Sequence, residues 1–146
     1  MTQPIRVLVA DDHEQMLAAI VSVLEDDPRF EVVATATTAA EAHRLASELP
    51  VHVALLDVNM PGSGVAAAEL IASLPQAPAV VAISAQSGAG VVEEMLRAGA
   101  VGYVTKGRVG DSLPDLLARC VHGEVVLATP AAAGALRGLM RSPARA

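Results

Sequence analysis

The stretch Val-His-Val-Ala-Leu-Leu-Asp-Val-Asn-Met-Pro-Gly, residues 51–62, decides the fold class, because an apolar run stops there on a carboxylate, Asp57. A second apolar run, residues 5–10, stops on the acidic pair Asp11 and Asp12. Short apolar runs of this kind are typical of strands buried on both faces of a parallel sheet. Neighbouring parallel strands open their carboxyl ends onto one crevice, so we expect the three carboxylates to lie close together.

Further apolar runs alternate with segments of helical composition along the chain, which predicts a parallel α/β sheet covered by helices. The runs cover approximately residues 5–10, 30–36, 51–57, 79–84 and 101–106. The fourth run ends on Ser84 and the fifth run ends on Lys106. A hydroxyl and an ammonium group are both suited to binding a phosphate. Crowded carboxylates require a cation, and oxygen ligands favour a hard divalent metal. The sequence therefore predicts a site for a phosphoryl group on a carboxylate.

With these residues in this order, the chain resembles the receiver domain of bacterial two-component response regulators over residues 5 to about 122. The resemblance implies a flavodoxin-like, doubly wound, five-stranded parallel sheet, (βα)5, with an extra C-terminal helix. It implies that Asp57 is the phosphoacceptor and that Mg²⁺ is the cofactor. The metal ligands would be Asp11, Asp12, Asp57 and the backbone carbonyl of Asn59. The switch residues would be Ser84, Tyr103 and Lys106, and the residues that tune dephosphorylation would be Asn59 and Gln86.

One position departs from the family pattern. The family usually has a proline after the lysine, often with a cis bond, and here Gly107 follows Lys106. A cis bond before a residue other than proline costs about 2.5–4 kcal/mol, so the isomer of this bond and the aim of Lys106 stay open. His13, which follows the acidic pair, is expected to begin a helix, and the four histidines are too scattered to predict a metal site.

The expected function is a signalling switch rather than an enzyme with an external substrate. A sensor histidine kinase would phosphorylate Asp57, and the changed surface would control a downstream output, with transcription expected because the chain resembles the helix-turn-helix branch. A second copy of the chain is a further candidate partner, through the fourth and fifth helices or the C-terminal helix. Two alternatives remain: an enzyme that passes through an aspartyl phosphate, and an interaction module that works without phosphate. Asn59 stands where phosphatases of the haloacid dehalogenase type carry an aspartate, which disfavours the enzyme.

Residues 124–146 differ in character from the rest, so we expect a receiver domain over residues 1–123 followed by a linker helix and tail. Thr129 and Pro130 form a good helix start. The helix would carry an apolar stripe without an assigned partner, and a terminal helix packed on its own domain is the alternative. This stripe consists of Leu136, Leu139 and Met140.

Composition limits the class of protein. Ten basic and sixteen acidic residues give a net charge of −6, which disfavours direct binding of nucleic acid. Hydrophobic residues make up 53% of the 146 residues, but no apolar stretch approaches the roughly 18 residues of a membrane span. The amino terminus has no signal-peptide pattern, and the single cysteine excludes an internal disulfide. We therefore expect a cytoplasmic protein without membrane contact.

Overall fold

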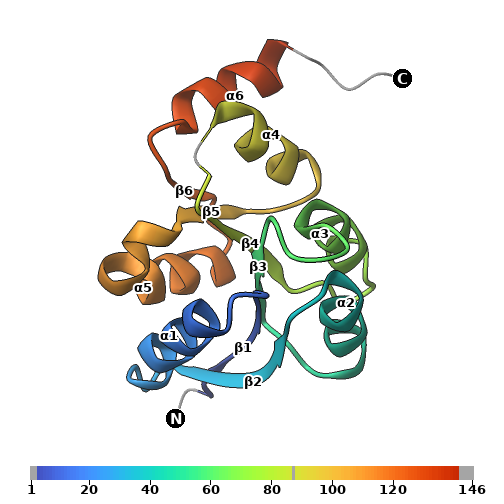
Figure 1. Ribbon diagram of the computed structural model, residues 1–146, viewed down its shortest axis with the longest axis vertical. Coiled ribbons are helices and arrows are strands. Elements are labelled where there is room, and N and C mark those ends of the chain that lie inside the picture. Colours follow the sequence, from blue (N-terminus) through green and yellow to red (C-terminus); the bar gives the residue numbers. More distant parts are fainter. Residues whose placement is uncertain (1–2, 87, 142–146) are drawn as a thin grey trace.

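A computed structural model describes residues 3–86 and 88–141, which form a six-stranded parallel sheet with helices on both faces (Figure 1). The strands are β1 (Ile5–Ala10), β2 (Phe30–Ala36), β3 (Val53–Asp57), β4 (Ala79–Ser84), β5 (Gly102–Thr105) and β6 (Val126–Ala128). The helices are α1 (Glu14–Glu25), α2 (Ala39–Glu48), α3 (Gly64–Ala72), α4 (Ala89–Arg97), α5 (Val109–Val121) and α6 (Ala132–Arg141), with a 3₁₀ turn, η1 (Lys106–Arg108), before α5.

The strand order β2-β1-β3-β4-β5-β6 places β3 near the middle of the sheet. Every residue of β3 is buried, because helices cover both of its faces. Helices α1 and α5 pack on one face, and α2, α3 and α4 pack on the other (Figure 1). The order reverses between β1 and β3, and the crevice at such a switch point is where ligands bind in open α/β sheets.

The predicted parallel α/β fold of the flavodoxin type is confirmed, and its strand count is corrected from five to six. Strand β6 pairs in parallel with β5, with Gly102 opposite Val126. The Val126 N–H also donates a hydrogen bond of 2.9 Å to the Val101 carbonyl. Part of the segment expected to be a linker is therefore an edge strand of the sheet.

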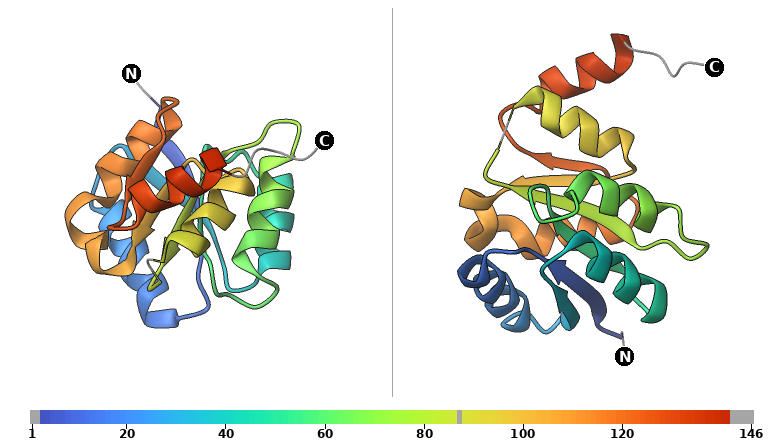
Figure 2. Two further views of the ribbon diagram at one scale, coloured as in Figure 1. Left: turned by 90° about the horizontal axis from the view of Figure 1, so that it is seen from above. Right: turned by 45° about the vertical axis from the view of Figure 1, so that its right-hand side comes forward.

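The extra C-terminal helix is present as α6, but it begins at Ala132 and not at Thr129 and Pro130. The Thr129 hydroxyl oxygen is buried and has no hydrogen-bond partner among the described residues, so it does not cap the helix. Helix α6 packs against α4, as Figure 2 shows, and buries Ala135 completely.

The stripe expected to lack a partner is thus partly covered by the chain's own α4. Leu136 and Met140 stay 45% and 82% exposed, while Leu139 is half-buried. Residues 142–146, the expected tail, lie outside the described residues. Among the described helices, none combines the length and the apolar character needed to cross a membrane.

Candidate functional site

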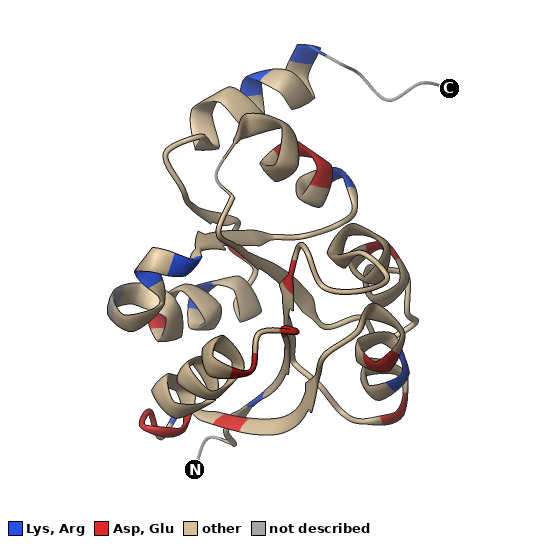
Figure 3. Cartoon of the chain, viewed as in Figure 1, with Lys and Arg blue, Asp and Glu red and all other residues tan. Residues whose placement is uncertain are grey.

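The three predicted acids meet at the carboxyl edge of the sheet. Asp11 follows β1 and is fully buried, Asp57 ends β3 with 1% exposure, and the Asp12 side chain is 33% exposed. Figure 3 shows acidic positions at the ends of β1 and β3, which face each other across the switch point. We refer to Asp11, Asp12 and Asp57 as the acid cluster.

The loop after Asp57 has its shape because glycines permit close backbone contacts. A Cβ at Gly64 would collide with the Asp57 carbonyl oxygen and with the Val58 backbone, so only glycine fits there without a shift. Gly62 has a φ of +88°, in the left-handed region that favours glycine. Ser63 is also left-handed at φ +79°, and its hydroxyl accepts a hydrogen bond from Ala66 N–H at the start of α3. The loop thereby holds Asp57 close to the beginning of α3.

Lys106 reaches the acid cluster from the end of β5. Its Nζ lies 3.0 Å from Asp11 Oδ2 and 3.5 Å from Asp57 Oδ2. The Lys106–Gly107 peptide bond is trans, which answers the question left open by the missing proline. The lysine side chain is 14% exposed, so its charge lies in a region largely removed from water.

The pKa values of the two buried acids shift in opposite directions. Burial would raise the pKa of Asp11, but hydrogen bonds from the His13 backbone N–H and from Lys106 outweigh it and lower the pKa. The pKa of Asp57 is raised chiefly by burial; the hydrogen bond from the Asn59 N–H opposes this shift, and the Asp11 charge adds to it. That N–H donates to Asp57 Oδ1 at 3.2 Å, whereas the buried Oδ2 accepts no hydrogen bond from the described residues.

The remaining predicted residues form a second group beside the acid cluster. Ser84 is fully buried, and its hydroxyl accepts a 2.9 Å hydrogen bond from the Gln86 N–H. The fully buried Tyr103 donates its hydroxyl proton to the Gln86 carbonyl at 2.8 Å, and burial raises the pKa of its phenol. The Gln86 backbone therefore links Ser84 to Tyr103, while the side chains of Asn59 and Gln86 lie exposed.

His13 lies at the site, although from the sequence we expected only that it would begin a helix. It does precede α1, but its ring turns toward the acids. The Nδ1 atom is 3.0 Å from Asp11 Oδ1 and 3.3 Å from Asp12 Oδ1. The signal available in the sequence was its position directly after the acidic pair.

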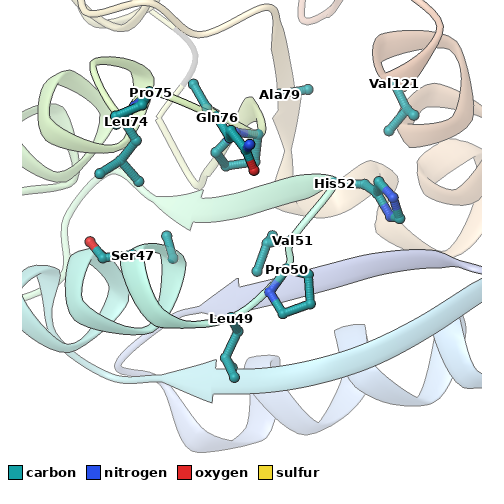
Figure 4. A pocket seen from close by; sticks show the side chains of 13 residues that line it. Ser47, Leu49, Pro50, Val51, His52, Leu74, Pro75, Gln76, Ala79 and Val121 are labelled. Carbon is teal, nitrogen blue, oxygen red and sulfur yellow. The ribbon is translucent and has the colours of Figure 1, made fainter.

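A separate hollow of about 670 Å³ lies at the opposite edge of the sheet (Figure 4). Pro50, Val51 and His52 line it just before β3, with Ala79 at the start of β4 and Val121 at the end of α5. No acidic or basic side chain other than histidine is among its lining residues. It therefore offers none of the charged groups that a phosphoryl site needs.

The profile described as the response regulator receiver domain matches residues 7–118, which is more than half of the chain. The chain belongs to the response regulator receiver family. Response regulator GacA of Pseudomonas viridiflava is 40% identical over 105 residues, covering 70% of this chain and 49% of that protein. A protein-glutamate methylesterase/protein-glutamine glutaminase of Carboxydothermus hydrogenoformans is 37% identical over 143 residues, covering 97% of this chain and 39% of that protein. The chain thus spans half or less of the length of these curated relatives.

The structure of this receiver domain agrees with that assignment. A crystal structure of a LuxR-family two-component response regulator from Aurantimonas sp. SI85-9A1 superposes with a TM-score of 0.85 at 25% identity, covering 94% of this chain and 99% of that one. The chain is therefore a receiver domain of two-component signalling, and the relatives differ in what accompanies that domain.

The acid cluster fits the magnesium ion that receiver domains generally bind. One ligand atom from each of Asp11, Asp12, His13 and Asp57 lies within 4.8 Å of the others. Asp57 Oδ2 is buried without a hydrogen bond, so it keeps lone pairs for a cation. Carboxylate oxygens are the ligands that Mg²⁺ prefers.

Proposed function

We propose that this receiver domain accepts a phosphoryl group on Asp57 from a sensor histidine kinase and passes the change to a downstream output, with transcription as the output. The observation that carries the proposal is the placement of Asp57 Oδ2, buried and without a hydrogen bond, 3.5 Å from the Lys106 ammonium. Asp11, Asp12, Asp57 and the Asn59 carbonyl would hold Mg²⁺. When bound, the ion would neutralise the carboxylates and the incoming phosphoryl oxygens.

The residues of the chain supply the rest of the chemistry. A carboxylate oxygen of Asp57 forms the O–P bond while the P–N bond of the phosphohistidine donor breaks, and the donor ring keeps the electron pair. Lys106 offers its positive charge to the developing phosphoryl oxygens. Catalysis is then positioning and charge stabilisation, as in other phosphoryl transfers. Asn59 and Gln86, whose side chains are exposed, are placed to influence attack by water.

The switch would run through the Gln86 backbone. The Ser84 hydroxyl accepts a hydrogen bond from Gln86 N–H, and on phosphorylation it would donate its own proton to a phosphoryl oxygen. A movement of Ser84 toward that oxygen would also move the Gln86 backbone. The Gln86 carbonyl accepts the hydrogen bond from Tyr103, so the tyrosine would respond to this movement. A charge added at Asp57 would thus change the surface near α4 and β5.

We further propose that the chain acts on no external substrate and works in the cytoplasm, as is typical of the family. The position two residues after Asp57 is Asn59, so the general acid of an aspartyl-phosphate phosphatase is missing there. Methylesterase activity belongs to a relative of which this chain matches 39%. A second copy of the chain remains a predicted partner.

The test is phosphorylation by a small donor. Acetyl phosphate with Mg²⁺ should add one phosphoryl group that hydroxylamine removes, as mass spectrometry would show. Asp57→Asn should abolish the addition, whereas Asp115→Asn, which alters a 78% exposed acid on α5, should leave it intact. Phosphate on a serine or histidine, or modification that persists in Asp57→Asn, would show that Asp57 is not the acceptor.

A further inference from the structure

His13 turns its ring into the acid cluster and not onto the helix that it precedes. It is the N-cap residue of α1, yet its side chain makes no capping hydrogen bond. The backbone N–H donates to Asp11 Oδ1 at 2.8 Å, which fixes the residue beside the cluster. Its Nδ1 lies 3.0 Å from Asp11 Oδ1, 3.3 Å from Asp12 Oδ1 and 3.7 Å from Asp57 Oδ2. One imidazole nitrogen therefore faces all three acids, and the Lys106 Nζ lies 3.3 Å from the same nitrogen.

These spacings are those of neighbouring ligands around one cation. In an octahedral site with ligand distances of about 2.1 Å, adjacent ligand atoms are about 3 Å apart. The contacts of Nδ1 with Asp11 and Asp12 are close to this value, and the contact with Asp57 requires a small adjustment. The His13 side chain is 64% exposed, so the ring has room for that adjustment. Asp57 Oδ2, which accepts no hydrogen bond from the described residues and lies 3.5 Å from the Lys106 ammonium, faces the same space.

We propose that His13 is a further metal ligand through Nδ1, and that it raises the preference of the site for Ni²⁺ over Mg²⁺. This inference rests on the proposed metal site formed by the acid cluster. Imidazole nitrogen suits ions such as Ni²⁺, whereas Mg²⁺ prefers oxygen and gains little from a nitrogen ligand. His13 therefore sets which divalent ion the site selects, while the three carboxylates supply the charge that any such ion needs.

The experiment compares tag-free wild-type protein with His13→Gln and with His122→Gln. His122 is exposed at the end of α5, at the opposite edge of the sheet, and serves as the matched control for loss of a histidine. Calorimetric titration should show Ni²⁺ affinity reduced at least about tenfold in His13→Gln, since even loss of an outer-shell partner typically costs 10–100-fold. The Mg²⁺ affinity should change much less. His122→Gln should match the wild type for both ions.

A direct readout comes from the electron spin echo of bound Mn²⁺. Wild type and His122→Gln should show coupling to an imidazole ¹⁴N nucleus, and His13→Gln should not. If His13 instead competes with the metal, His13→Gln will bind every ion equally or more tightly and the wild type will show no ¹⁴N coupling. That result would overturn the inference about His13. It would not contradict Mg²⁺ binding or phosphorylation of Asp57. A wild-type protein that binds none of these ions would overturn the proposed metal site as well.

Discussion

At the scale of single residues, the raised pKa of Asp57 has a consequence for stability. Burial, and then the charge of Asp11, disfavour the ionised carboxylate in the folded state relative to the ordinary value of 3.8. A raised folded-state pKa contributes stability below the unfolded pKa, and that stability is lost as the pH rises through the folded pKa. At neutral pH, ionised Asp57 therefore destabilises the metal-free fold.

We accordingly expect Asp57→Asn to raise the unfolding free energy of the metal-free protein at pH 7, because the variant buries no charge at this position. The gain should shrink as the pH falls through the raised folded-state pKa toward the ordinary value of 3.8, because the wild-type carboxyl then becomes neutral. Urea unfolding with a chelator present, repeated across this pH range, measures the difference. A gain that stays constant with pH would show that the charge of Asp57 is not its cause.

The acids and the lysine of the site could be predicted because their positions follow from strand direction alone. Asp11 and Lys106 follow strands of the parallel sheet and Asp57 ends another, and the ends of those strands must meet at one edge. The ring of His13 could not be placed in this way. Its direction depends on a side-chain rotamer and on the turn made by its N–H with Asp11, and neither is encoded in a spacing.

At the scale of secondary-structure elements, the contact between α4 and α6 is close because small residues line it. Gly134 lies near Ala89, where an added Cβ would stand 3.3 Å from the alanine Cβ. A Cβ at Gly138 would collide with the Glu93 carboxylate, which pairs with Arg97 at 2.9 Å. Figure 3 shows acidic positions on α4 and basic positions on α6. Ala135 lies fully buried on the same helix.

Because Ala135 is fully buried in the core beside α4, Ala135→Leu should push α6 away from α4 and cost about 1–3 kcal/mol of unfolding free energy. Ala133→Leu adds the same atoms to an exposed position of α6 and should stay within about 0.5 kcal/mol of the wild type. Denaturant unfolding compares the two, and phosphorylation of Asp57 should survive in both. Equal effects at residues 133 and 135 would contradict the packing of α6 on α4.

Strand β6, which was not expected from the sequence, shows the limit of prediction from sequence patterns. β6 has three residues, all only partly buried, which is too short for an apolar run to be distinguished from a loop. Thr129 and Pro130 matched a helix start, yet after the chain leaves β6 the helix α6 begins two residues later than Pro130, at Ala132. The pairing of β6 with β5 is a tertiary contact, so no local rule could indicate it.

At the scale of the whole molecule, the acid cluster concentrates like charge in a protein that is already acidic, with a net charge of −6. Among the described residues, Lys106 is the lysine or arginine that offsets that charge, at 3.0 and 3.5 Å from the two buried acids. A divalent cation that binds the folded state alone should therefore stabilise the entire domain. At tenfold over its dissociation constant, the expected gain is about 1.4 kcal/mol.

We therefore expect Mg²⁺ to raise the melting temperature of the wild-type protein, with a shift that grows with the logarithm of the ion concentration once the site is saturated. Asp12→Ala removes a ligand whose side chain is partly exposed, so the domain should still fold while most of the shift is lost. Glu48→Ala removes an exposed acid at the end of α2 and should keep the full shift. If Mg²⁺ stabilises Asp12→Ala and Glu48→Ala equally, the ion acts by screening the net charge of the protein and not by binding at the acid cluster.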